Sequence, residues 1–133
     1  MYLDRLLNQG SEPVLEKWLD FTDARERVLG EDIVNASTPN YVQKDLSLPQ
    51  FQSMLLRKVQ QQQTAAPGSV DFGDISMDIQ DPRRNILFHD GNNRSMEQLM
   101  SDQAKNALQH SLAVELLRDQ YSIMETALQE GQK

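Results

Sequence analysis

Residues 95–131 read SMEQLMSDQAKNALQHSLAVELLRDQYSIMETALQEG, a stretch without proline and with glycine only at its end. Ser95 followed three residues later by Gln98 is the pattern of a capping box, which begins a helix. Counting in sevens through the stretch gives apolar residues over about five repeats, so the sequence predicts one long C-terminal helix with a heptad seam. The positions of this seam are Met100, Ala107, Val114, Tyr121 and Leu128.

The companion positions of the seam are apolar except for two polar residues. A helix of this length extends for about 50 Å, and a lone amphipathic helix requires a partner. The N-terminal helix is the obvious partner within the chain, but it is shorter, so part of the seam remains for another chain. The companion positions are Met96, Gln103, His110, Leu117 and Met124.

An amphipathic pattern also covers residues 13–36, where apolar residues recur three or four apart. Pro13 fits the first turn of a helix, and the run around Pro39 and Asn40 predicts its end, because Thr38 before a proline avoids the helical region. The apolar positions of this predicted helix are Val14, Trp18, Phe21, Val28, Leu29 and Ile33.

In the middle of the chain, segments predicted to be extended or helical alternate with a segment predicted to be a loop. Residues 41–46 are predicted to be extended, and a second helix is expected over 48–63 with Ser47 as its cap and Pro49 in its first turn. Residues 64–82 mix Ala, Pro, Gly, Ser and Asp and indicate a flexible loop or small β excursion. A short strand is possible over 83–88.

The predicted fold class is therefore mainly α, with long N- and C-terminal helices forming a coiled-coil-like inner domain. We divide the chain into four segments: an N-terminal helix and turn (1–46), a mid-chain helix (47–63), a flexible central region (64–94) and the C-terminal heptad helix (95–133). The chain has 133 residues with 38% hydrophobic and 6% aromatic residues, and its mean hydropathy is −0.61. With this composition, the chain is close to the limit at which burial of apolar surface no longer offsets the conformational entropy lost on folding.

Several classes of protein are excluded by composition. The net charge of −7 without a basic run offers no footprint for nucleic acid, and no apolar run is long enough to cross a bilayer. The first residues do not form a cleaved signal peptide of the secretory type. Zero cysteines exclude a disulfide framework, a thiol nucleophile and a cysteine metal site.

Catalytic motifs are also absent from the sequence. His89 and His110 lack the spacing of a metal site, and a hydrogen-bonded or partly exposed histidine is the better interpretation of both. The acidic residues of the central loop lack the ligand spacing of an EF-hand. We therefore predict no enzymatic activity, no cofactor and no metal.

Two separated blocks resemble a known family. Residues 32–41 read DIVNASTPNY, similar to the signature N-I-A-N-x-x-T-P-G-[YF] of the bacterial flagellar basal-body rod protein family. Residues 90–97, DGNNRSME, resemble the block D-G-N-x-V-D-x-D that opens the last helix of that family, and they continue into AKNALQH at 104–110. The total length and short middle are most similar to the proximal rod members. The departures are Asp32, Val34, Asn40, Arg94 and Ser95, of which Asn40 still permits a left-handed turn.

The resemblance implies a structural subunit of the proximal rod in the bacterial flagellum basal body. Members of this family leave through the flagellar type III export apparatus without a cleaved signal peptide, and assemble in the periplasm with copies of themselves and other rod and basal-body proteins. Torque passes through the assembly. The subunit interface and motif residues implied here are Trp18, Ile33, Asn35, Thr38, Pro39, Tyr41, Met100, Ala107, Val114, Leu117, Tyr121, Met124 and Leu128.

An alternative interpretation is a soluble α-helical adaptor or export chaperone that binds partner proteins through the heptad seam. An adaptor is expected to unfold cooperatively and to form a stable oligomer when purified. A rod subunit is expected to be largely unstructured at its ends as a monomer.

Overall fold

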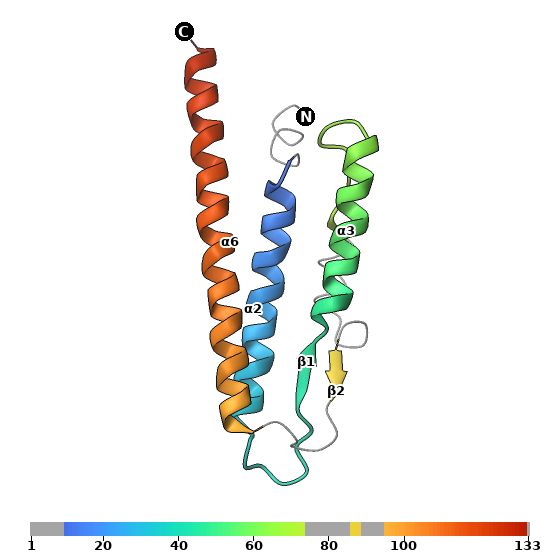
Figure 1. The fold of residues 1–133 in the computed structure, drawn as a ribbon, viewed down its shortest axis with the longest axis vertical. Coiled ribbons are helices and arrows are strands. Elements are labelled where there is room, and N and C mark those ends of the chain that lie inside the picture. The colour runs from blue at the N-terminus through green and yellow to red at the C-terminus, as the bar shows by residue number, and fades with distance from the viewer. Residues whose placement is uncertain (1–9, 74–85, 89–94, 133) are drawn as a thin grey trace.

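The computed structural model describes residues 10–73, 86–88 and 95–132. In this part of the chain, three helices lie side by side: α2 (Glu12–Val34) in the centre, α6 (Met96–Gly131) along one flank and α3 (Leu48–Thr64) along the other (Figure 1). The prediction of a mainly helical protein with long terminal helices and a shorter middle helix is confirmed. His89, residues 74–82 of the predicted loop and residues 90–94 of the second motif block lie outside the described residues.

Local sequence signals explain where each helix begins. The Ser95 side chain accepts a hydrogen bond from the Gln98 backbone N–H, and the Gln98 side chain returns one to the Ser95 backbone, which confirms the capping box. Ser47 caps α3 through the Gln50 backbone N–H. Proline occupies the first turn of both α2 and α3, where its missing N–H is not needed.

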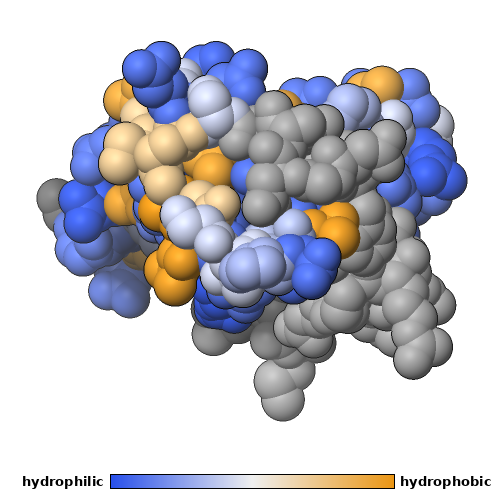
Figure 2. Space-filling view, turned by 90° about the horizontal axis from the view of Figure 1, so that it is seen from below, coloured by the Kyte–Doolittle hydropathy of each residue, from blue (hydrophilic) through white to orange (hydrophobic). Residues whose placement is uncertain are grey.

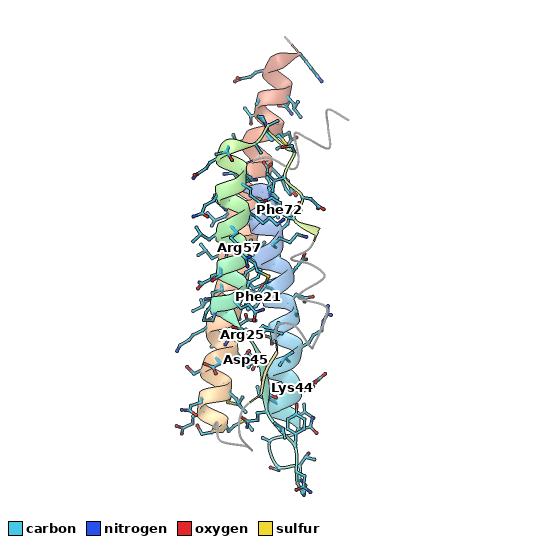
Figure 3. The ribbon with its side chains drawn as sticks, turned by 90° about the vertical axis from the view of Figure 1, so that its right-hand side faces the viewer. Phe21, Arg25, Lys44, Asp45, Arg57 and Phe72 are labelled. Carbon is cyan, nitrogen blue, oxygen red and sulfur yellow. The ribbon has the colours of Figure 1, made fainter. Side chains whose placement is uncertain are left out.

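The hydrophobic core lies between α2, α3 and the segment that follows α3. Its centre is a stack of Phe21 from α2 on Phe51 from α3, with ring centroids 4.2 Å apart and ring planes 9° from parallel. Trp18 packs edge-on against Phe51 at 5.2 Å. The stacked rings and the chain returning past Phe72 hold α3 against α2, and Figure 3 shows Phe21 and Phe72 on this side of the molecule. The buried members of this core are Phe21, Leu46, Phe51, Leu55, Val70 and Phe72.

A two-stranded antiparallel sheet lies below α3 in Figure 1. Strand β1 (Lys44–Leu46) pairs with β2 (Ile86–Phe88), with Asp45 opposite Leu87. Asp45 is fixed to α2 by a two-pronged ion pair: Arg25 Nε and Nη2 donate to its two carboxylate oxygens at 2.9 and 3.0 Å. Both side chains are close to buried, so the pair joins the sheet to the central helix.

Helix α6 packs along α2 and continues beyond the beginning of that helix, so that its last turns stand clear of α2 (Figure 1). No helix in the described ranges combines the length and the apolar character needed to span a membrane.

Candidate subunit interface

The turn that ends α2 is held by one buried carboxylate. Asp32 is fully buried, and its Oδ1 accepts hydrogen bonds from the Tyr41 hydroxyl at 3.1 Å and from the Lys44 backbone N–H at 3.0 Å. These bonds connect the last turn of α2 to the chain entering β1. Asp32 therefore fixes the direction in which the chain leaves the helix.

The residues between Asp32 and Tyr41 close the turn by local hydrogen bonds. The Asn35 side chain donates to the Glu31 carbonyl at 2.9 Å, and the Thr38 hydroxyl donates to Asn35 Oδ1 at 3.2 Å. Asn40 has a φ of 64°, the left-handed conformation predicted for it. Thr38 and Pro39 are exposed, whereas Asn35 and Tyr41 are half-buried, so the turn presents a polar outer edge.

The role of Asp32 is not predicted by the sequence patterns. Asp32 differs from the asparagine of the family signature, and it is absent from the candidate residues. The available signal was a carboxylate on the apolar side of a helix, one residue from Ile33, since buried acids in such positions are normally paired or hydrogen-bonded. A second residue of this kind is Asp45, whose partner Arg25 lies on another element.

The contact between α2 and α6 is polar at its centre. Asn106 is buried, and its Nδ2 donates to the Thr22 carbonyl at 2.8 Å and to Glu26 at 3.5 Å. Gln103 Nε2 donates to Glu26 Oε1 at 2.7 Å, and His110 Nδ1 shares a 2.9 Å hydrogen bond with the Thr22 hydroxyl. His110 is therefore a hydrogen-bonded structural histidine. This polar seam, comprising Thr22, Glu26, Gln103, Asn106 and His110, sets the register between the two helices.

The contact with α2 lies one residue earlier than the predicted heptad positions. The buried residues of α6 are Leu99, Asn106 and Ala113, each directly before a predicted position. In the companion series, Met96 is exposed, and the other four residues are half-buried: Gln103, His110, Leu117 and Met124. In the predicted series, Val114 is half-buried, and the others are exposed: Met100, Ala107, Tyr121 and Leu128.

Tyr121 is anchored although its ring is exposed. Its hydroxyl donates to Glu16 Oε1 at 3.0 Å across the two helices. Partial burial and this carboxylate raise the pKa of the Tyr121 hydroxyl above its ordinary value. Trp18 and Ile33 on α2 are half-buried, and Trp18 belongs to the aromatic packing around Phe51.

A second row of large apolar side chains on α6 was not part of the predicted seam. Leu108, Leu112 and Leu116 follow one another at a spacing of four, and Ile123 lies seven further on, so all four face one side of the helix. Their exposed fractions are 72%, 61%, 44% and 64%. We call these four residues the leucine stripe. Figure 2 shows the molecule from below, where apolar and hydrophilic surface lie side by side at its lower end.

A cleft of about 530 Å³ lies where α2 begins, between the end of α3 and the later turns of α6. Glu12 lines it and is buried, and its Oε2 has no hydrogen-bond partner among the described residues. Burial raises the pKa of the Glu12 carboxyl, and the charge of Glu16 raises it further. The described ranges contain no group of three or more side chains suited to bind a metal ion.

Comparison with known proteins adds one relationship. The chain is similar to the flagellar basal body rod protein FlgB of Bacillus subtilis (strain 168). The two are 24% identical over 132 residues, which is 94% of this chain and 98% of FlgB. No family model matches the chain, and no solved structure matches it significantly. The similarity extends over nearly the whole length of both chains.

Proposed function

We propose that this chain is a structural subunit of the proximal rod of the bacterial flagellum and performs no chemistry. The observation that carries the proposal is the similarity to FlgB over nearly the whole length of both chains. The two motif blocks support it, because they lie far apart in the sequence, at residues 32–41 and 90–97. The first of them is a structured turn held by Asp32, Asn35 and Thr38.

In this proposal the subunits bind one another through their helices and pass torque along the assembly. The exposed members of the heptad series, among them Met100, Tyr121 and Leu128, bind neighbouring subunits, because covering them removes apolar surface from water. The turn at 35–41 directs the chain from the inner helix to the outer surface of the rod. Contacts between unlike faces produce an open helical assembly.

The proposed location follows from the same relationship. The chain leaves the cell through the flagellar type III export apparatus and retains its N-terminus. It then assembles in the periplasm with copies of itself and with other rod proteins. Secretion and fractionation of a tagged chain, with and without a working flagellar exporter, test this. Recovery with purified basal bodies is expected when the exporter works, and cytoplasmic retention in both strains contradicts the proposal and favours the adaptor.

Substitutions in the heptad series test the interface. Met100→Asp and Val114→Asp are expected to prevent incorporation into basal bodies while secretion of the chain continues. Met100 is the sharper site, because it is 56% exposed and its substitution spares the packing on α2. Gln52→Asp on the exposed side of α3 adds the same charge and is the control, with normal incorporation expected. Normal swimming of cells that carry Met100→Asp would show that Met100 is not part of the subunit interface.

A further inference from the structure

The three leucines of the leucine stripe on α6 are spaced symmetrically, so their spacing is the same when the helix is read in the opposite direction. Leu108 and Leu116 each lie four residues from Leu112, one on either side of it. When two copies of α6 cross in antiparallel orientation at Leu112, Leu108 of each copy therefore faces Leu116 of the partner subunit. Three leucines on each copy then meet three on the other in one apolar contact.

Two charged residues on the same side of α6, Lys105 and Asp119, follow the same symmetry. Lys105 lies seven residues before Leu112 and Asp119 seven residues after it, and both are exposed on the side of the stripe. Neither has an ion-pair partner among the described residues. In the antiparallel arrangement, each Lys105 faces Asp119 of the partner subunit. In a parallel arrangement, lysine would face lysine and aspartate would face aspartate, which is repulsive.

From this register we propose that two copies of this chain form a symmetric dimer through the leucine stripes of antiparallel α6 helices, with Leu112 on the two-fold axis. The partner is a second copy rather than an unrelated helix, because the apolar spacing and the two charges are complementary to the same sequence reversed. The proposal does not depend on the function proposed above. It adds a closed contact that covers the stripe in the free protein.

The size of the contact sets the expected affinity. From Leu108 to Ile123 the stripe extends for about 22 Å, and from Lys105 to Ile123 for about 27 Å, so one helix face buries about 400 Å² on each copy. Stable protein interfaces bury about 800 Å² on each partner. The dimer is therefore weak, with a dissociation constant on the order of tens of micromolar. An assembly that uses the same face must first separate the pair.

Sedimentation velocity of the full chain over a wide range of concentration tests the dimer. The chain is expected to change from monomer to dimer as its concentration is raised through tens of micromolar. Lys105→Glu and Asp119→Lys are each expected to weaken the dimer about tenfold, because each replaces two attractive contacts by repulsive ones. The double variant restores both pairs, and its affinity returns to that of the natural chain. A monomer at every concentration, or a double variant no tighter than the single ones, overturns the proposal.

Cysteine cross-linking locates the two-fold axis. The chain has no cysteine, so Leu112→Cys introduces a single thiol, which meets its own copy at the axis and forms a disulfide-linked dimer under mild oxidation. Leu56→Cys on α3 is the matched control, because Leu56 is 58% exposed but lies away from the stripe. Equal cross-linking of the two variants shows random collision and contradicts the symmetric dimer. Far-UV circular dichroism of each variant confirms that the helices are retained.

Discussion

The two faces of helix α2 are held by opposite chemistry. On one face Phe21 stacks on Phe51 of α3 with Trp18 at the edge, and the surrounding residues are apolar and buried. On the other face, Thr22 and Glu26 bind Asn106 and Gln103 of α6 through hydrogen bonds. The first face buries apolar area alone. The second combines buried apolar residues of α6, Leu99 and Ala113, with a polar seam that sets a register.

The difference bears on assembly. A polar seam contributes little net free energy, because its groups exchange hydrogen bonds with water for hydrogen bonds with protein. Helix α6 is held to α2 partly through this seam, and the leucine stripe on its outer side is still exposed. Such a helix is suited to gain further stabilisation from neighbouring chains, which agrees with the proposed role as a rod subunit.

The largest effect is expected from the aromatic face. Phe51→Ala removes the ring stacked on Phe21 and leaves a cavity, so it is expected to lower the free energy of unfolding by about 3–5 kcal/mol. Urea denaturation followed by circular dichroism measures this. Leu56→Ala, on the exposed side of the same helix, is the control and is expected to change stability by about 0.5 kcal/mol or less. Comparable losses in both variants would mean that α3 does not form the core.

A smaller and different effect is expected from the polar face. Asn106→Leu replaces a buried amide, whose Oδ1 has no partner among the described residues, by an apolar side chain of similar size. The free energy of unfolding is expected to stay within about 1 kcal/mol of the natural value or to rise. The register, however, is expected to loosen, because the hydrogen bond from Asn106 to Thr22 is lost.

A short bifunctional thiol reagent that cross-links cysteines at positions 26 and 103 reports this register, since the Gln103 and Glu26 side chains meet between the two helices. The yield of this cross-link is expected to fall at least twofold when Asn106→Leu is added. A loss of about 3 kcal/mol in stability with an unchanged cross-link would reverse the comparison, and would make the polar seam a main source of stability.

The smallest effect is expected from Glu12, in the first turn of α2. The pKa of Glu12 is raised in the folded chain, so its ionisation opposes folding above that pKa, and the cost disappears below the ordinary carboxyl value. Glu12→Gln is therefore expected to raise the thermal midpoint by a few degrees at pH 7, and the gain is expected to vanish near pH 4. Glu130→Gln removes the same charge from an exposed site, and no pH-dependent gain is expected from it.

Much of the fold could be predicted from local patterns. The caps at Ser47 and Ser95, the prolines in the first turns and the left-handed Asn40 depend on a few neighbouring residues, so sequence was sufficient to find them. The face of α6 that binds α2 could not be found in this way. Counting from Met100 placed the seam one residue from Leu99 and Asn106, because heptad counting follows apolar residues and the true contact contains a buried asparagine.

The sequence by itself determined that the chain forms long amphipathic helices joined by a sharp turn, since periodicity, caps and proline act within a few residues of one another. Only the tertiary structure decided which sides of those helices are covered. It paired Asp32 with Tyr41, Arg25 with Asp45 and Asn106 with Thr22, and it left the leucine stripe in solvent. The physical reason is that burial and hydrogen bonding of a side chain depend on residues far away in the sequence, which no local pattern contains.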